Sequence, residues 1–136
     1  MLVRREHSEK ELYRKLTARG FDADVVCSVL VQLKTENLQS DYRFTEAYVH
    51  NRIARGYGPL RIRQELHEKG LAENLIEVFL TEQDSDWMQR LDLVRQKKFG
   101  KAMPADYKEQ VRQSRFLQYR GFSTEQIRRL FKPAEI

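Results

Sequence analysis

The segment 62–71, IRQELHEKGL, decides the fold, because its pattern recurs elsewhere in the chain. Segments 12–21 (LYRKLTARGF) and 113–122 (QSRFLQYRGF) also end in a leucine, three further residues, a glycine and a large apolar residue. The three glycines are 50 and 51 residues apart. Such a spacing is typical of a tandem array of structural repeats.

Each repeat is predicted to contain two short helices joined at its glycine. Apolar residues after the first two glycines follow the spacing i, i+1, i+4 and i+5, and the last three of these positions are apolar after the third glycine. This spacing marks one face of an α-helix and excludes a strand. Ser8 with Glu11, and Ser123 with Gln126, have the spacing of a capping box at a helix start. A basic residue precedes each glycine, as is typical of a helix end that needs positive φ. These glycines are Gly20, Gly70 and Gly121.

A longer third helix is predicted in the first two repeats, over residues 40–55 and 85–99. Trp87, Leu91 and Val94 share one face of the second of these helices, so Trp87 is predicted to be a core residue. The third repeat ends without room for such a helix. We therefore predict an all-α tandem array of three-helix repeats, the third truncated, over residues 1–56, 57–101 and 102–136.

Composition and charge favour a binding protein over one with a large catalytic cleft. Of the 136 residues, 40% are hydrophobic and 33% are charged, which suits exposed amphipathic helices. Residues 87–136 hold 12 Lys or Arg against 5 Asp or Glu, whereas residues 1–86 hold 13 against 15. This asymmetry favours an acidic partner, either nucleic acid or a negatively charged protein surface. The alternative is a solvated basic face without a ligand.

The sequence also predicts where the chain resides. Cys27 lies in the apolar run 25–30, which predicts a small buried thiol and no disulfide framework. Apolar runs are far shorter than the roughly 20 residues that cross a bilayer, and the first residues lack the apolar region of a signal peptide. We expect a soluble, cytoplasmic protein without a membrane association.

The stretch Gly56-Tyr57-Gly58-Pro59 lies between two predicted helices. It has neither the Lys-Ser/Thr nor the preceding strand of a phosphate-binding loop, so we interpret it as a helix stop, a turn and a helix start. Arg61 and Arg63 in the following first turn would oppose the helix dipole. Binding at this junction and a plain charged surface are both compatible with that observation.

Catalytic chemistry is not indicated by the residues. The histidines at 7, 50 and 67 are scattered, and no cluster has the spacing of metal ligands. The acidic pairs lie at helix starts, where caps and the dipole favour negative charge. We expect a protein that is not an enzyme, with no cofactor, no metal and no small-molecule substrate.

Several motifs, in order along nearly the whole chain, resemble the bacterial regulatory protein family RecX. They are Arg4-Arg5-Glu6-His7-Ser8 with Glu11-Leu12 and Lys15-Leu16, then Asp41-Tyr42-Arg43-Phe44 with Ala47 and Arg52, then Gly56-Tyr57-Gly58-Pro59 with Ile62, Glu65-Leu66 and Lys69-Gly70. The central block, residues 41–70, is the specific part. The chain differs from the usual family pattern in having little of the leading helix and no ninth helix.

The resemblance implies an elongated, curved array of helices that binds the recombinase RecA and inhibits its filament on DNA. It implies restraint of recombinase, ATPase and coprotease activities in recombinational repair and the SOS response, and it implies no cofactor. We expect a monomer. The alternative is a helical module that binds single-stranded DNA without sequence preference and competes for it.

Two basic surfaces are the predicted contacts with the RecA filament or with DNA. Arg and Tyr are favoured at the centres of protein interfaces, which makes Arg52 and Tyr57 the first candidates. The patch at the Gly-Tyr-Gly-Pro junction comprises Arg52, Arg55, Tyr57, Arg61 and Arg63. The patch in the basic third comprises Lys97, Lys98, Lys101, Arg112, Arg115, Arg128 and Arg129.

Overall fold

The computed structural model describes residues 6–36, 39–82 and 86–132, and all its regular elements are helices. Arg4, Arg5 and Ser85, which carry part of the predicted motifs and helices, lie outside these residues. The elements are α1 Glu9–Ala18, α2 Ala23–Thr35, α3 Asp41–Ala54, α4 Pro59–Glu68, α5 Glu73–Glu82, α6 Trp87–Phe99, α7 Tyr107–Tyr119 and α8 Thr124–Phe131. The predicted all-α fold is confirmed.

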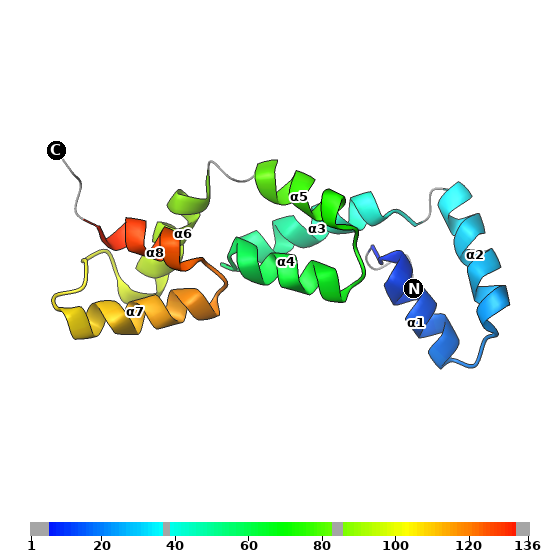
Figure 1. Ribbon diagram of the computed structural model, residues 1–136, viewed down its shortest axis with the longest axis horizontal. Helices are drawn as coiled ribbons and strands as arrows, with labels where there is room; N and C mark the ends of the chain where they lie inside the picture. Colours follow the sequence, from blue (N-terminus) through cyan, green and yellow to red (C-terminus); the bar gives the residue numbers. More distant parts are fainter. Residues whose placement is uncertain (1–5, 37–38, 83–85, 133–136) are drawn as a thin grey trace.

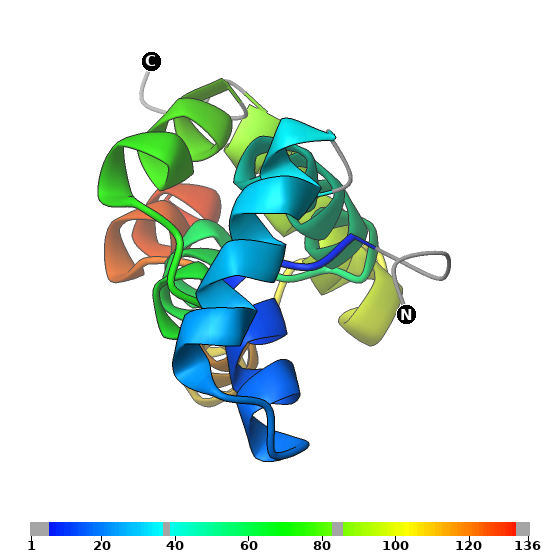
Figure 2. The same ribbon diagram turned by 90° about the vertical axis from the view of Figure 1, so that its right-hand side faces the viewer.

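The helices form three groups in a row, which makes the molecule elongated (Figure 1). Helix α1 packs with α2, α3 packs with α4 and α5, and α6 packs with α7 and α8. Viewed along the row, the groups lie one behind another (Figure 2). Each long helix, α3 or α6, therefore packs with the two helices that follow it in the chain. The predicted ranges 1–56, 57–101 and 102–136 instead group each long helix with the two helices that precede it. None of the helices described is long and apolar enough to cross a membrane.

The predicted helix ends are confirmed in detail. Ser8 and Ser123 each form a complete capping box, in which the serine oxygen accepts from a backbone N–H and the Glu or Gln side chain accepts from the serine N–H. Pro59 is the first residue of α4. The three repeat glycines have positive φ, between +83° and +101°.

A continuous apolar core joins the second and third groups. Trp87 is only 2% exposed, and its ring packs edge-on against Phe122 at a centroid distance of 6.4 Å. The prediction that Trp87 is a core residue is confirmed. The first group has a separate, smaller core formed by Leu12, Val26 and Leu30.

The prediction that Cys27 is buried is wrong, because its thiol is exposed. In the second group, α3 covers α5, but no described helix covers α2 in the same way. Phe21 is therefore 53% exposed, whereas Leu71, its counterpart after Gly70, is 4% exposed. Val25 is 52% exposed for the same reason. The apolar spacing correctly predicted a helix, but only part of its apolar face is buried.

The second and third groups meet at a close approach of two backbones, which we call the Gly58 joint. The N–H of Gly58 donates to the Arg120 carbonyl at 2.7 Å, and the N–H of Leu60 donates to the Gly121 carbonyl at 2.9 Å. A Cβ on Gly58 would lie 2.6 Å from the Gly121 carbonyl oxygen, and one on Gly121 would lie 2.8 Å from the Arg61 nitrogen. Only glycine permits this contact.

The first and second groups meet in the corresponding way at what we call the Ser8 joint. The Ser8 hydroxyl donates to the Lys69 carbonyl at 3.0 Å, and Lys69 forms an ion pair with Glu11 at 3.2 Å. A Cβ on Gly70 would overlap the Lys10 side chain. In both joints, the start of one short helix docks on the glycine turn of the next group.

Replacing Gly121 with alanine tests the close approach. Gly121→Ala combines the strain of positive φ with a clash against Arg61, whereas Gly56→Ala has a similar φ (+87°) in the same kind of helix-ending turn, and its Cβ would come no closer than 3.4 Å to Val94. We expect G121A to lower the free energy of unfolding by about 1–3 kcal/mol more than G56A, because overpacking costs that amount. Urea unfolding followed by Trp87 fluorescence measures the difference. Equal losses would show that the clash relaxes without cost.

Candidate partner interface

Tyr57 is surrounded by three arginines from three elements. The guanidinium carbon of Arg52 lies 3.8 Å from its ring centroid, that of Arg61 lies 4.4 Å away, and that of Arg120 lies 4.9 Å away. The Gly58 joint produces this arrangement, because it brings the end of α7 to the turn between α3 and α4. Tyr57 is thus half-buried, with cations over its ring.

Glu65 balances the charge of this cluster. Arg52 donates two hydrogen bonds to its carboxylate at 2.8 and 2.9 Å, Tyr48 donates one at 2.9 Å, and Arg61 donates one at 3.3 Å. Burial alone would raise the pKa of Glu65, but the hydrogen bonds from Tyr48 and Arg52 and the charge of Arg52 lower it overall. Burial, then the hydrogen bond to Glu65, raises the pKa of Tyr48 to about 12.

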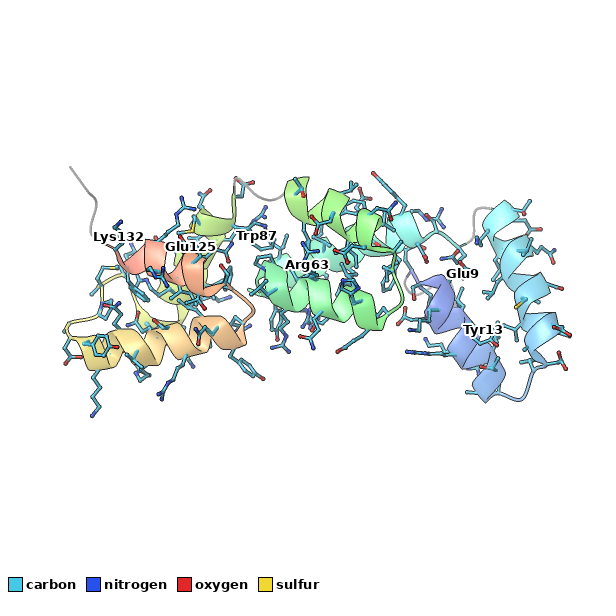
Figure 3. All side chains as sticks on the ribbon, viewed as in Figure 1. Glu9, Tyr13, Arg63, Trp87, Glu125 and Lys132 are labelled. Carbon is cyan, nitrogen blue, oxygen red and sulfur yellow. The ribbon has the colours of Figure 1, made fainter. Side chains whose placement is uncertain are left out.

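Arg52, Tyr57 and Arg61 therefore lie together, and their side chains contact one another and Glu65. The Arg52 side chain is 16% exposed and paired with Glu65. Arg63, labelled in Figure 3, lies on α4. Its guanidinium pairs with Glu73 and Glu77 of α5 and not with Glu65. The positive charges of Arg61 and Arg63 were predicted to oppose the α4 dipole. Ion pairs with Glu65, for Arg61, and with Glu73 and Glu77, for Arg63, offset that effect.

Arg55 belongs to a different surface, which we call the cationic groove. This groove lies between the end of α3, α6 and α7, and its volume is about 450 Å³. Lys97 and Lys98 of the second predicted patch line it together with Arg55. The groove is lined by Ile53, Ala54, Arg55, Gly56, Arg90, Leu93, Val94, Lys97, Lys98, Phe116 and Arg120.

Two arginines of the groove, Arg90 and Arg120, were missed by the sequence analysis. Arg120 bridges the groups, since its guanidinium donates to the Arg55 carbonyl at 3.0 Å. The repeat contains a signal for Arg120, because Arg19 and Lys69 occupy the same position before their glycines. Arg90 has no such signal; only the approach of α6 to the end of α3 places it beside Arg55.

One hydrogen-bond donor of the Arg90 guanidinium has no acceptor among the described residues. Its Nη2 lies 3.6 Å from Asp86, but its Nη1 is buried and has no hydrogen-bond partner among the described residues. Leaving a buried N–H without an acceptor costs about 1–3 kcal/mol.

The other predicted basic residues do not line this groove. Arg112 forms a bidentate pair with Glu109, at 2.6 and 2.9 Å, and lines a different hollow along α7 with Arg115. Arg128 and Arg129 are exposed on α8. Lys101 is exposed in the loop after α6, and its carbonyl accepts a 3.4 Å hydrogen bond from the buried Arg95.

No three His, Cys, Asp or Glu side chains converge as metal ligands within the described ranges. A row of three similar helix groups is typical of helical-repeat proteins, a class that commonly binds partners through extended surfaces. Models of the RecX family match the chain as the first, second and third three-helix domains, over residues 1–33, 40–80 and 84–131. The chain belongs to the RecX family of regulatory proteins.

Individual relatives agree with this assignment. The chain is 44% identical over 128 residues to the regulatory protein RecX of Halorhodospira halophila, covering 94% of this chain and 80% of the relative. It is 42% identical to that of Pseudomonas entomophila, covering 100% and 88%. The crystal structure of RecX from Lactobacillus salivarius has the same fold, with a TM-score of 0.78 at 21% identity over 95% of this chain and 86% of that one.

Substitution of Glu65 tests the internal role of the Tyr57 cluster. We expect Glu65→Gln to lower the free energy of unfolding at pH 7 by about 1–3 kcal/mol, because charge-assisted hydrogen bonds are lost. The pKa of Glu65 is lower folded than unfolded, so its contribution is present above the unfolded value of 4.5 and is lost as pH falls through the folded value. The difference from wild type should shrink on acidification.

Glu68→Gln on the same helix is the matched control, because Glu68 is exposed. Urea unfolding between pH 7 and pH 3 measures both variants. The internal role of Glu65 would be contradicted if Glu65→Gln and Glu68→Gln lowered the free energy of unfolding equally. It would also be contradicted if the loss caused by Glu65→Gln did not change with pH.

Proposed function

We propose that this chain binds RecA filaments on DNA and inhibits their recombinase, ATPase and coprotease activities, and so modulates recombinational repair and the SOS response in the cytoplasm. Membership of the RecX family is the observation that carries the proposal. Its relatives are named regulatory proteins, which supports a role without catalysis.

The shape of the molecule supports a mechanism through surface contact. A row of helical groups can lie along a groove of a helical filament and contact several subunits. The cationic groove opens on this row and supplies positive charge for an acidic filament surface or for the DNA backbone. The exposed residues Lys101, Arg112, Arg115, Arg128 and Arg129 extend the positive surface over the third group.

The proposal is tested with preformed RecA filaments on single-stranded DNA. ATP hydrolysis is measured as the chain is added at substoichiometric and then equimolar amounts, with binding to bare DNA measured in parallel. We expect hydrolysis to decay well below one chain per RecA, while bare-DNA binding stays weak. Inhibition only at DNA-coating concentrations would favour competition for single-stranded DNA, and no inhibition would overturn the proposal.

Charge reversal in the groove tests where the filament is contacted. We expect Lys97→Glu with Lys98→Glu to raise the concentration for half-inhibition by about tenfold or more, because about 1.4 kcal/mol of lost binding has that effect. Circular dichroism should show unchanged helicity, since both side chains are exposed.

Two double variants with the same change in charge serve as comparisons. Arg14→Glu with Arg19→Glu changes exposed residues of the first group, outside the groove, and should have little effect. Arg128→Glu with Arg129→Glu tests the predicted contacts on α8. Equal weakening by all of these variants would show that overall charge matters and that the groove does not.

A further inference from the structure

Apolar side chains line the cationic groove together with its cations. They include Ile53, Leu93 and Val94, and Leu93 is 57% exposed. A leucine exposed to this extent beside a hollow of about 450 Å³ offers area that an aliphatic side chain of a ligand can cover. The groove thus combines charge with a place for an apolar group.

The charged residues that line the groove are positive, and none of the described residues in its lining is acidic. Its cations come from three segments: Arg55 after α3, Arg90, Lys97 and Lys98 on α6, and Arg120 after α7. Arg55, Lys97 and Lys98 are exposed, so an incoming carboxylate can pair with them.

Among the residues that the structure describes, none gives this groove an open aromatic face on which a nucleobase could stack. Phe116, its aromatic residue, already has the Lys98 ammonium 5.5 Å and the Arg120 guanidinium 5.2 Å from its ring centroid. The edge of Phe99 also packs against it at a centroid distance of 5.4 Å. Proteins that hold single-stranded nucleic acid stack bases on exposed aromatic rings, which the groove does not offer.

We propose that the cationic groove binds an acidic peptide segment of the protein partner, with an aliphatic side chain of that segment covering Leu93 and Val94 and its carboxylates pairing with Arg55, Lys97 and Lys98. The positive charge and the exposed apolar side chains of the lining together select this occupant. The inference rests on the proposed function in one respect only, namely the identity of the protein that carries the acidic segment. The chemistry of the segment follows from the groove itself.

Binding of short peptides to the full chain tests the inference without RecA. One fluorescein-labelled peptide carries Glu and Asp around a central Leu, and a second has Gly in place of that Leu. A third is basic, and a labelled oligothymidylate represents single-stranded DNA. Fluorescence anisotropy at two salt concentrations measures each affinity. We expect the Leu peptide to bind about tenfold more tightly than the Gly peptide, because covering one aliphatic side chain contributes about 1.4 kcal/mol or more.

Variants locate the site. Leu93→Gln should reduce the affinity for the Leu peptide about tenfold and leave the affinity for the Gly peptide almost unchanged. Leu60→Gln is the matched control, because Leu60 is similarly exposed, at 53%, and lies outside the groove. Lys97→Gln should weaken both acidic peptides and make their binding less dependent on salt.

Three results would overturn the inference: equal affinity for the Leu and Gly peptides, equal effects of Leu93→Gln and Leu60→Gln, or displacement of the Leu peptide by oligothymidylate at lower concentration than by unlabelled peptide. Inhibition of RecA filaments by the wild-type chain is measured separately. Peptide binding without inhibition would contradict the proposed function alone, and inhibition without peptide binding would contradict this inference alone.

Discussion

The close approach of the Gly58 and Gly121 backbones is the constraint on which the rest of the structure depends. Two backbone hydrogen bonds cross it, and neither glycine can carry a side chain there without a clash. Because the start of α4 is held against the turn after α7, the end of α3 is held beside α6. Both the Tyr57 cluster and the cationic groove follow from that placement.

The two joints of the row share a geometry but differ in what stabilises them. The Gly58 joint lies over a continuous apolar core that spans the second and third groups. The Ser8 joint depends on polar contacts, including the N–H of Glu9 donating to Asp41 at 2.9 Å, and the first group keeps its own small core. The apolar surface shared by the second and third groups makes them a single packed body, to which the first group is attached by hydrogen bonds and ion pairs.

The arginines near Tyr57 show which parts of the candidate site could be predicted from the sequence. Their types and their clustering in the chain predicted a contact patch or a plain charged surface, and in the structure Arg52 and Arg61 both lie over the Tyr57 ring. Which of them remain available to a partner could not be predicted, because that depends on Glu65, one helical turn after Arg61, and on Arg120, 63 residues after Tyr57. Arg55 and Arg90 join Lys97 and Lys98 only through the packing of α6 against the end of α3.

By itself, the sequence determined the helices, their capped ends and the repeat, because these depend on local spacing, on side chains within one turn and on glycines that need positive φ. It also determined the resemblance to RecX, carried by residues 41–70. The tertiary structure alone decided how the helices group, because a repeating sequence pattern does not show at which helix each structural group begins. Long-range contacts alone decided that Cys27 is exposed, that Arg52 is paired and that Arg90 lines a groove, since burial and charge pairing depend on segments distant in the chain.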